Sequence, residues 1–362
     1  MKLFIGILIL ILLYFNYEVK EHFQWNQEKI YKKCSEKSPG NILGKVFSKF
    51  NIARDNNTDD WDLYIPCGYN NVEKELLKVK IKNKDQKIFG IKGCDSIVSK
   101  NKVWELLTRK YGRDIAKTIM PETYILKNEL DLFKKDYVKN NMYILKKNIQ
   151  RKRGLKITNN LEEILNAAKE KYKVVQSYVK DVFLVNNRKV NLRIYLLLVC
   201  RNNDVEAYLY NEGKCIYTNK DYDPNDIIDP ETNITSLNLD QSIYEYSPFS
   251  FVELRHYLNQ KNFDGTLLFK RIEKKIKKLF YAVKDSLCNL DTLKNNTSFQ
   301  LFGLDVIFTN TLRPYILELN KGPAMKHKND KDFTLKNKLN TDILNLVGLV
   351  DIYEKNNFKK IG

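Results

Sequence analysis

The sequence has few residues of the kinds that build zinc sites and disulfide frameworks. It contains three histidines, and its cysteines are scattered without a C-x-x-C pair. The six cysteines are Cys34, Cys67, Cys94, Cys200, Cys215 and Cys288. Because a structural zinc site needs four clustered ligands, this spacing argues against zinc. It also argues against a disulfide framework and predicts reduced thiols, as in a cytosolic protein.

The motifs of several common nucleotide-binding folds are also missing. There is no G-x-G-x-x-G loop, no G-K-S or G-K-T phosphate loop, and no H-R-D or D-F-G triplet. Rossmann dinucleotide sites, P-loop enzymes and protein kinases therefore lose their main sequence support. No internal repeat or low-complexity tract is present either.

Positive charge is what the chain has in excess. Lysine and arginine total 62 against 44 aspartate and glutamate, which gives a formal net charge of +18 over 362 residues. Such a surplus favours acidic partners, namely nucleic acid, an anionic membrane or an acidic polypeptide. It is equally typical of a lysine-rich surface that reflects codon usage. Since no nucleic-acid-binding motif accompanies the charge, we do not expect a nucleic-acid partner.

The N-terminus carries a short apolar run, LFIGILILILLYF, from Leu3 to Phe15. The run is shorter than the ~20 residues of a membrane-spanning helix, and its length is typical of a signal-peptide core. No small-residue cleavage site follows, so we predict an uncleaved membrane anchor at residues 1–20. The lysines after the run predict that the large domain faces the cytosol. Four N-x-[ST] sequons point weakly to the opposite side, and they start at Asn56, Asn233, Asn295 and Asn296.

The hydrophobic pattern divides the rest of the chain into an α+β protein with several lobes. The predicted parts are a polar linker (21–60), an N-terminal lobe (61–127), a central lobe (128–185), a C-terminal lobe (186–350) and a tail (351–362). In the central lobe, two strands flank a basic glycine-containing loop, and a helix and a third strand follow. This order is compatible with a small antiparallel sheet that folds over a nucleotide. The C-terminal lobe has a long alternating strand from Lys189, a capping box at Ser250 and a final hairpin.

The final hairpin offers a candidate metal site. Glu318 and Asn320 are two residues apart on one strand, so their side chains share a face. The short turn T-N-T brings Asp305 on the preceding strand near that face. Two carboxylates and an amide oxygen form a hard oxygen site, suited to Mg²⁺ that bridges phosphates. The alternative is that these acidic residues only face water on a half-buried strand.

Cationic residues follow two other predicted strands. Lys189, Asn191 and Arg193 alternate with apolar residues, so one face of that strand is polar and cationic. Such a face can hold phosphate or ribose hydroxyls, although polar outer faces are common in ordinary sheets. Lys146 ends an apolar strand just before the basic loop that contains Arg153. A lysine and an arginine placed in this way can clamp phosphates, or can simply lie at the surface.

The order of these segments resembles that of the tubulin-tyrosine-ligase-like family. IVSKNKVWELLTRKYGR and IMPETYIL resemble its N-terminal lobe, and YILKKNIQRKRGLKI resembles its lysine strand and flexible phosphate loop. VVQSYV and RKVNLRIYLLLV resemble its QxYI and RKxDxRxYxLV motifs. LYNEG resembles its YREG turn, and FGLDVIFTNTLRPYILELNKGPA resembles its terminal GFD and EVNxxP motifs. The resemblance runs from about residue 60 to residue 350 with the motifs in order.

The resemblance implies an ATP-grasp fold, with the nucleotide in a cleft between lobes. It implies ATP and Mg²⁺ as cofactors, and a reaction that joins a free amino acid to a carboxylate of an acidic polypeptide, such as a tubulin tail. The implied nucleotide-binding residues are Lys146, Gln176, Ser177, Tyr178, Val179, Lys189 and Asn191. The residues implied to face the γ-phosphate are Arg193, Lys100 and Arg153, and the implied metal ligands are Asp305, Glu318 and Asn320.

Three positions depart from the family pattern. Asn191 stands where the family has Asp, Asn211 where the YREG turn has Arg, and Ser236 where an HLTN motif has its Asn. These changes fall mostly on the acceptor side and spare most of the nucleotide and metal residues. The sequence therefore favours a ligase, with a catalytically impaired protein that binds nucleotide or an acidic partner as the alternative.

Overall fold

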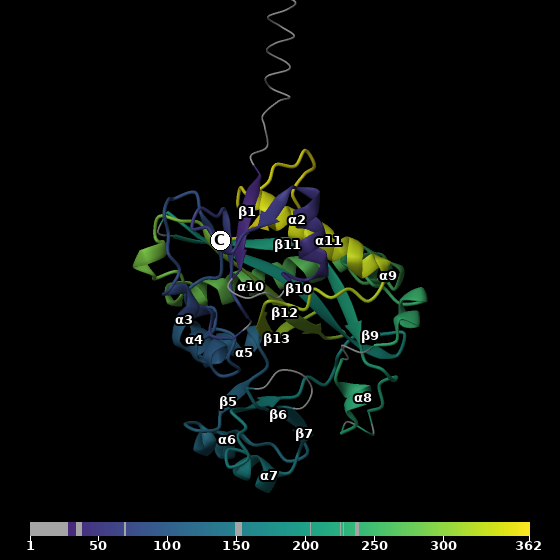
Figure 1. Ribbon diagram of the computed structural model, residues 1–362. Helices are drawn as coiled ribbons and strands as arrows, with labels where there is room; N and C mark the ends of the chain where they lie inside the picture. Colours follow the sequence, from purple (N-terminus) through teal and green to yellow (C-terminus); the bar gives the residue numbers. More distant parts are fainter. Residues whose placement is uncertain are drawn as a thin grey trace, which may run out of the picture.

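The computed structural model describes residues 28–33, 38–68, 70–148, 154–202, 204–224, 226, 228–235 and 239–362. Within these ranges the chain forms two sheets with helices packed around them (Figure 1). The larger sheet is mixed, and the smaller one is wholly antiparallel. This architecture agrees with the predicted α+β class.

The larger sheet has the strand order β14-β11-β10-β12-β4-β3-β1-β2, with β13 paired to β12 and β9 paired to β10. Its strands are β1 (Lys29–Lys33), β2 (Ile52–Arg54), β3 (Leu63–Ile65), β4 (Lys87–Phe89), β9 (Leu184–Val185), β10 (Arg188–Arg201), β11 (Asp204–Tyr217), β12 (Ser298–Phe308), β13 (Pro314–Lys321) and β14 (Phe358–Lys360). The predicted final hairpin is confirmed as β12–β13, and β10 forms a second hairpin with β11.

Both faces of the long strand β10 are buried along its second half. Leu196 and Leu198 belong to the core on one face, whereas Tyr195 and Leu197 belong to the core on the other. A strand covered on both faces reads as a continuous apolar run, which is what IYLLLVC shows. Apart from Arg201 at its end, the polar residues of β10 therefore lie at its beginning, from Arg188 to Arg193.

The smaller sheet has the order β5-β8-β6-β7 and lies at one end of the molecule, next to β13 (Figure 1). Its strands are β5 (Thr123–Ile125), β6 (Tyr143–Lys146), β7 (Leu155–Thr158) and β8 (Val174–Ser177). Helices α6 (Leu130–Asp136) and α7 (Leu161–Asn166) bury Phe133 and Ile164 against it. The predicted strand, loop, strand, helix and strand are all present. The middle of the basic loop, with Arg153, lies outside the described residues.

The remaining helices cover the larger sheet. They are α2 (Asn41–Lys49), α3 (Val72–Leu76), α4 (Lys102–Tyr111), α5 (Arg113–Ile119), α8 (Pro230–Asn233), α9 (Phe251–Gln260), α10 (Gly265–Val283) and α11 (Asp330–Leu346), with short 3₁₀ helices η2 (Gln241–Glu245), η3 (Lys284–Ser286) and η4 (Asp291–Leu293). Ile272, Ile276 and Leu279 form a buried apolar stripe along α10. The predicted capping box is confirmed at the start of α9.

The segment predicted as a polar linker contributes β1, α2 and β2 to the larger sheet. Ile42, Leu43, Val46 and Phe47 lie on one side of α2 and are buried, which places this helix beside α11. The helical spacing of these residues brings them onto one face, but the prediction of a linker missed this short pattern within a largely polar stretch. The apolar run at Leu3–Phe15 lies outside the described residues. Among the helices that are described, none is both long and apolar enough to span a membrane.

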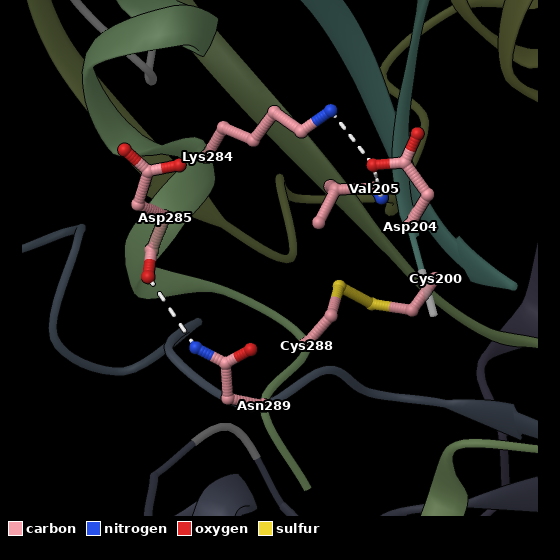
Figure 2. The surroundings of a disulfide bond; sticks show 7 residues. All are labelled: Cys200, Asp204, Val205, Lys284, Asp285, Cys288 and Asn289. Atoms are coloured by element: carbon pink, nitrogen blue, oxygen red, sulfur yellow. Dashed lines mark hydrogen bonds and ion pairs between the residues drawn. A yellow bond between two sulfur atoms is a disulfide. The ribbon is translucent and has the colours of Figure 1, made fainter. Parts of the chain in front are cut away.

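The expectation of reduced cysteines is wrong for the described part of the chain. Cys200 near the end of β10 and Cys288 after η3 form a disulfide, with their Cα atoms 5.7 Å apart (Figure 2). Cys67 is disulfide-bonded as well, whereas Cys94 and Cys215 are buried free thiols. The pair was missed because 88 residues separate the two cysteines and only the fold brings them together.

Candidate functional site

Three charged side chains form a row across neighbouring strands of the larger sheet. In the register, Arg193 on β10 lies opposite Asp305 on β12, and Asp305 lies opposite Glu318 on β13. Residues directly opposite each other in an antiparallel pair share a face, so the three side chains converge. Arg193 donates to Asp305 through Nε (2.7 Å to Oδ1) and Nη2 (3.2 Å to Oδ2). The row thus places the guanidinium of Arg193 beside the neighbouring carboxylates of Asp305 and Glu318.

A glycine makes room for this row. A Cβ added at Gly303 would lie 2.9 Å from Cβ of Pro323 and 3.1 Å from Cδ of Arg193. Gly303 is two residues before Asp305 and lies opposite Asn320 in the register. The absence of a side chain at this position therefore lets the chain after β13 pack closely beside the Arg193 guanidinium stem.

The predicted metal ligands are together in the structure. Glu318 forms an ion pair with Lys100, which precedes α4, and it accepts a hydrogen bond from Nδ2 of Asn320 at 2.8 Å. Asp305 lies directly across from Glu318. The oxygens of the two carboxylates and the amide are the donors that Mg²⁺ prefers. The structure therefore brings the predicted donor set to one place.

Burial and the neighbouring charges shift the pKa values of the site residues in different directions. Burial raises the pKa of Asp305, and Arg193 opposes that rise. For Glu318 burial would also raise the pKa, but Lys100 and Asn320 outweigh it and hold the value at about 2. Burial and the nearby Lys100 lower the pKa of Lys146 to about 8, although Glu318 and Asp305 act against this. Glu318 is thus firmly ionised, while Lys146 loses its charge just above neutral pH.

Lys146 and Gln176 approach the carboxylates from the smaller sheet. Nζ of Lys146, at the end of β6, lies 3.4 Å from the carbonyl oxygen of Leu317. Lys100, Lys146, Gln176 and Glu318 line one pocket together with apolar residues. Nε2 of Gln176 donates to Oγ1 of Thr123 at 2.8 Å, whereas its Oε1 is buried and has no partner within the described residues. An unpaired buried amide oxygen is the kind of atom that a ligand's amino group satisfies.

A second group of polar residues surrounds Lys189. Its ammonium contacts the hydroxyl of Tyr178 and lies 3.0 Å from Oδ1 of Asn233, which also accepts from the Tyr178 hydroxyl at 2.6 Å. Burial lowers the pKa of Lys189 to about 7. Asn191 donates to Oγ1 of Thr235 at 3.0 Å. Sequence reasoning missed Asn233 and Thr235, because their only signal was a sequon and a departure from the HLTN motif.

The strand that carries Gln176 uses its amides within the sheet. The backbone N–H of Ser177 donates to the carbonyl oxygen of Glu122 at 2.8 Å, and that of Tyr178 donates to the carbonyl oxygen of Met142 at 3.1 Å. Val179 follows and is half-buried. Within this predicted nucleotide-binding stretch, the Oε1 atom of Gln176 is the buried side-chain atom without a partner among the described residues.

A buried charge cluster beside Arg193 also escaped sequence reasoning. Lys214 on β11 lies opposite Arg193, and its Nζ is 3.3 Å from Oδ1 of Asp332 at the start of α11. Lys336, one turn along α11, places its Nζ 2.9 Å from Oδ2 of the same carboxylate. Asp332 is fully buried. The aspartate and lysine four residues apart on a helix were a usable signal, but nothing in the sequence placed that helix beside β10.

The three residues that differ from the family pattern lie in different parts of the molecule. Asn191 lies in the site, as described above, whereas Asn211 on β11 is exposed. Ser236 lies outside the described residues, as does Arg153. The arginine that the resemblance expects at position 211 is therefore replaced by a neutral side chain that faces solvent.

A separate acidic cluster does not fit a metal. Glu73, Cys94 and Asp95 are the one group of at least three His, Cys, Asp or Glu side chains with close ligand atoms in the described ranges. The carboxylates of Glu73 and Asp95 each accept a hydrogen bond from the other residue's backbone N–H, at 2.8 and 2.9 Å. Asp95 also pairs with Lys321, and burial raises the pKa of the Cys94 thiol to about 12. These contacts indicate a structural role for the cluster, which links the segments of Glu73, Asp95 and Lys321.

The chain is similar to known proteins over most of its length. The model of the tubulin-tyrosine ligase family matches residues 79–357. Mouse tubulin monoglutamylase TTLL4 is 22% identical over 353 residues, which covers 91% of this chain and 29% of the mouse protein. Probable tubulin polyglutamylase ttll-9 of Caenorhabditis elegans is 25% identical over 281 residues, covering 72% of this chain and 65% of the worm protein. The chain thus spans less than a third of the mouse relative. Since the family match covers most of its length, this chain belongs to the tubulin-tyrosine ligase family.

Proposed function

We propose that this chain is an ATP- and Mg²⁺-dependent ligase that joins an amino acid to a carboxylate of a polypeptide. The observation that supports this most is the row of Arg193, Asp305 and Glu318, with Lys100 and Lys146 beside it. Cations and carboxylates gathered at one place are what a site for a metal-bound triphosphate requires. In this proposal the fold is ATP-grasp, and the nucleotide binds where the smaller sheet faces β13.

The residues that are present fit a nucleotide. The buried, unpaired Oε1 of Gln176 can accept a hydrogen bond from an adenine amino group. Lys146 and Lys100 line the same pocket and would face the phosphates, while Lys189 and Asn191 would lie nearer the adenosine. Phosphate oxygens would give Lys146 and Lys100 strong hydrogen-bond acceptors, of which the nucleotide-free protein supplies only some.

The donor set also fits magnesium, which would be held by Asp305, Glu318 and Asn320. When bound, the ion would neutralise charge on the phosphates. Arg193 and Lys100, which now pair with the two carboxylates, would be released to face the γ-phosphate. Preorganised cations around a transferring phosphoryl group are the main source of catalysis in such sites.

The chemistry then has two steps. A carboxylate oxygen of the acceptor attacks the γ-phosphorus, the bond to the bridging oxygen breaks, and ADP leaves from an acylphosphate. The amine of the free amino acid attacks the acyl carbon, phosphate leaves, and the amide forms as the amine gives up a proton. Arg193 and Lys100 would stabilise the negative charge that moves in the first step.

The acceptor is proposed to be acidic. The relatives carry names of tubulin glutamylases, and the formal charge of +18 would attract a glutamate-rich segment. We therefore propose glutamate-rich polypeptide as the acceptor class. Binding of such peptides should weaken as salt rises, since exposed charges are screened. Salt-independent binding would contradict an acceptor held by charge.

The test is ATP turnover by the full chain with Mg²⁺, glutamate-rich peptides and free amino acids, with peptide mass followed. We expect ADP together with a mass gain that identifies the added residue. Glu318→Gln and Lys146→Ala should each lower turnover at least a hundredfold. Glu105→Gln is the matched control, because Glu105 pairs with Lys102 on the surface of α4 and should leave turnover unchanged. Equal turnover in Glu318→Gln and the native chain would overturn the proposal.

A second candidate is a protein of this fold that binds nucleotide or an acidic partner without turnover. The exposed Asn211, which stands where the family has arginine, favours it. The same experiment separates the two. Nucleotide binding that is lost in Lys146→Ala, without any ADP formed in the presence of acceptor, would support the binding protein over the ligase.

A further inference from the structure

The described cysteines are either bridged or shielded from solvent. Cys200 and Cys288 form a disulfide, and Cys67 takes part in another. Cys94 and Cys215 are fully buried, and burial raises the pKa of the Cys94 thiol to about 12. A buried thiol with a raised pKa is inert. None of these residues thus presents the exposed, reactive thiolate that is typical of a redox-sensing site.

The Cys200–Cys288 bond is placed as a structural cross-link. Figure 2 shows that it ties the end of β10 to the segment after η3, near the ion pair of Lys284 and Asp204. Cys200 lies seven residues along β10 from Arg193, which is roughly 23 Å at the rise of a strand. The sulfurs are therefore remote from the proposed chemistry. Bonds of this kind form and persist in oxidising compartments and are rare in the cytosol.

The four sequons differ in their access to solvent. Asn233 is buried and hydrogen-bonded to Lys189, and Asn296 is buried and donates to the carbonyl oxygens of Asn83 and Gln86. Asn56 is half-buried, and its Oδ1 accepts from the backbone N–H of Lys33 at 3.0 Å. Asn295, just after η4, is exposed. Asn295 is thus the exposed one of the four sequon asparagines and the most accessible to modification in the folded protein.

From the disulfides and this exposed sequon we infer that the folded domain resides on the oxidising, lumenal side of a membrane and that Asn295 carries an N-linked glycan. The apolar run at Leu3–Phe15 has the length of a signal-peptide core and follows a lysine, which fits export. The lysines after the run favour the cytosol, but large domains are translocated largely regardless of such charges. The inference therefore replaces the cytosolic orientation expected from the sequence.

The consequence for the ligase concerns its acceptor, and this part rests on the proposed function. An enzyme on the lumenal side would modify an acidic polypeptide of that compartment, and it would need ATP on the same side of the membrane. The location itself does not depend on the activity. Glycosylation and disulfide formation are read without any turnover, so a failure of the ligase proposal and a failure of this inference give different results.

The first experiment expresses the full chain in insect or mammalian cells and treats it with an enzyme that removes N-linked glycans. We expect a shift in mobility by one glycan. Thr297→Ala removes the Asn295 sequon and should abolish the shift. Ser298→Ala is the matched control, because it removes only the sequon of the buried Asn296 and should keep the shift. A native chain without any glycan, or an unchanged shift in Thr297→Ala, overturns the inference.

The second experiment alkylates the thiols of the same protein on cell lysis, under denaturing conditions and before any reductant is added. Peptide mapping should find Cys200, Cys288 and Cys67 protected until reduction, and Cys94 and Cys215 alkylated at once. The map would also identify the partner of Cys67. Alkylation of Cys200 and Cys288 without reduction shows a reducing compartment and overturns the inference.

Discussion

At the residue scale, the site is defined by buried charges whose partners lie on distant parts of the chain. Lys146 shows this most clearly, because its ammonium lies in a pocket with one other lysine and one carboxylate. Burial and Lys100 lower its pKa to about 8, against an ordinary lysine value above 10. The nucleotide-free protein therefore holds this lysine close to the point at which it loses its charge.

This pKa predicts a pH dependence of nucleotide binding. Below pH 8 Lys146 is charged and should bind phosphate without gaining a proton. Above pH 8 the free lysine is neutral, so binding of the anionic phosphates must take up one proton. We expect affinity for a non-hydrolysable ATP analogue to fall roughly tenfold for each pH unit above 8. Titration of the analogue at pH 7, 8 and 9 measures it.

The control for this prediction is Lys146→Arg, because arginine keeps its charge throughout that range. Between pH 8 and pH 9 its affinity should fall about tenfold less than that of the native chain. Lys189, with a pKa of about 7, titrates nearby and would contribute equally to both proteins. An identical slope in the native chain and in Lys146→Arg would show that another group is responsible.

At the element scale, the helix starts can be tested through their caps. Ser250 and Glu253 form a capping box at α9, in which Oγ of Ser250 accepts from the Glu253 N–H at 3.2 Å. Ser99 resembles a cap in the sequence, but α4 begins at Lys102 and the Ser99 hydroxyl donates to the carbonyl oxygen of Ser96 instead. The two serines therefore look alike in the sequence and differ in the structure.

We expect Ser250→Ala to lower the free energy of unfolding by about 1 kcal/mol, because the first turn of α9 loses its side-chain acceptor. Ser99→Ala should change it by less than about 0.5 kcal/mol, as is usual for surface substitutions. Urea unfolding of both variants beside the native chain gives the comparison. Equal losses in the two variants would contradict the assignment of the cap.

Elements with a strong local pattern could be predicted from the sequence. The β12–β13 hairpin followed from the alternation around Glu318 and Asn320, and the register then brought Asp305 to the predicted place. The region of β1, α2 and β2 was predicted as a linker, because its strands are short and because β1 meets β3, and α2 meets α11, only in the folded chain. Local periodicity shows a strand or helix only when most of its buried face is apolar.

At the scale of the whole molecule, contacts between distant segments decide what the sequence could not show. Lys214 and Asp332 are 118 residues apart in the sequence, yet they form one buried ion pair beside Arg193. Cys200 and Cys288 likewise meet across 88 residues. Neither pair leaves a trace in spacing or composition, since each depends on how complete elements pack. The order of motifs, which resembles that of the tubulin-tyrosine-ligase-like family, predicted the remaining residues of the candidate site.

The Cys200–Cys288 bond should stabilise the whole fold. It closes an 88-residue loop, and cross-links of this kind typically contribute about 2–4 kcal/mol by restricting the unfolded chain. We expect the double variant with alanine at both positions to lose about that much free energy of unfolding. Cys215→Ala is the control for removal of a buried sulfur alone, and it should cost less. Denaturant unfolding without reductant measures all three proteins.

The ion pairs of the nucleotide-free site have a consequence for the order in which ligands arrive. Lys100 occupies Glu318 and Arg193 occupies Asp305, so both carboxylates of the proposed metal site already have cations beside them. A lone divalent ion would have to displace both cations without offering them new partners. A metal–nucleotide complex brings phosphates that accept the displaced lysine and arginine. The resting protein would therefore exclude free divalent ions and admit the metal only as part of its nucleotide.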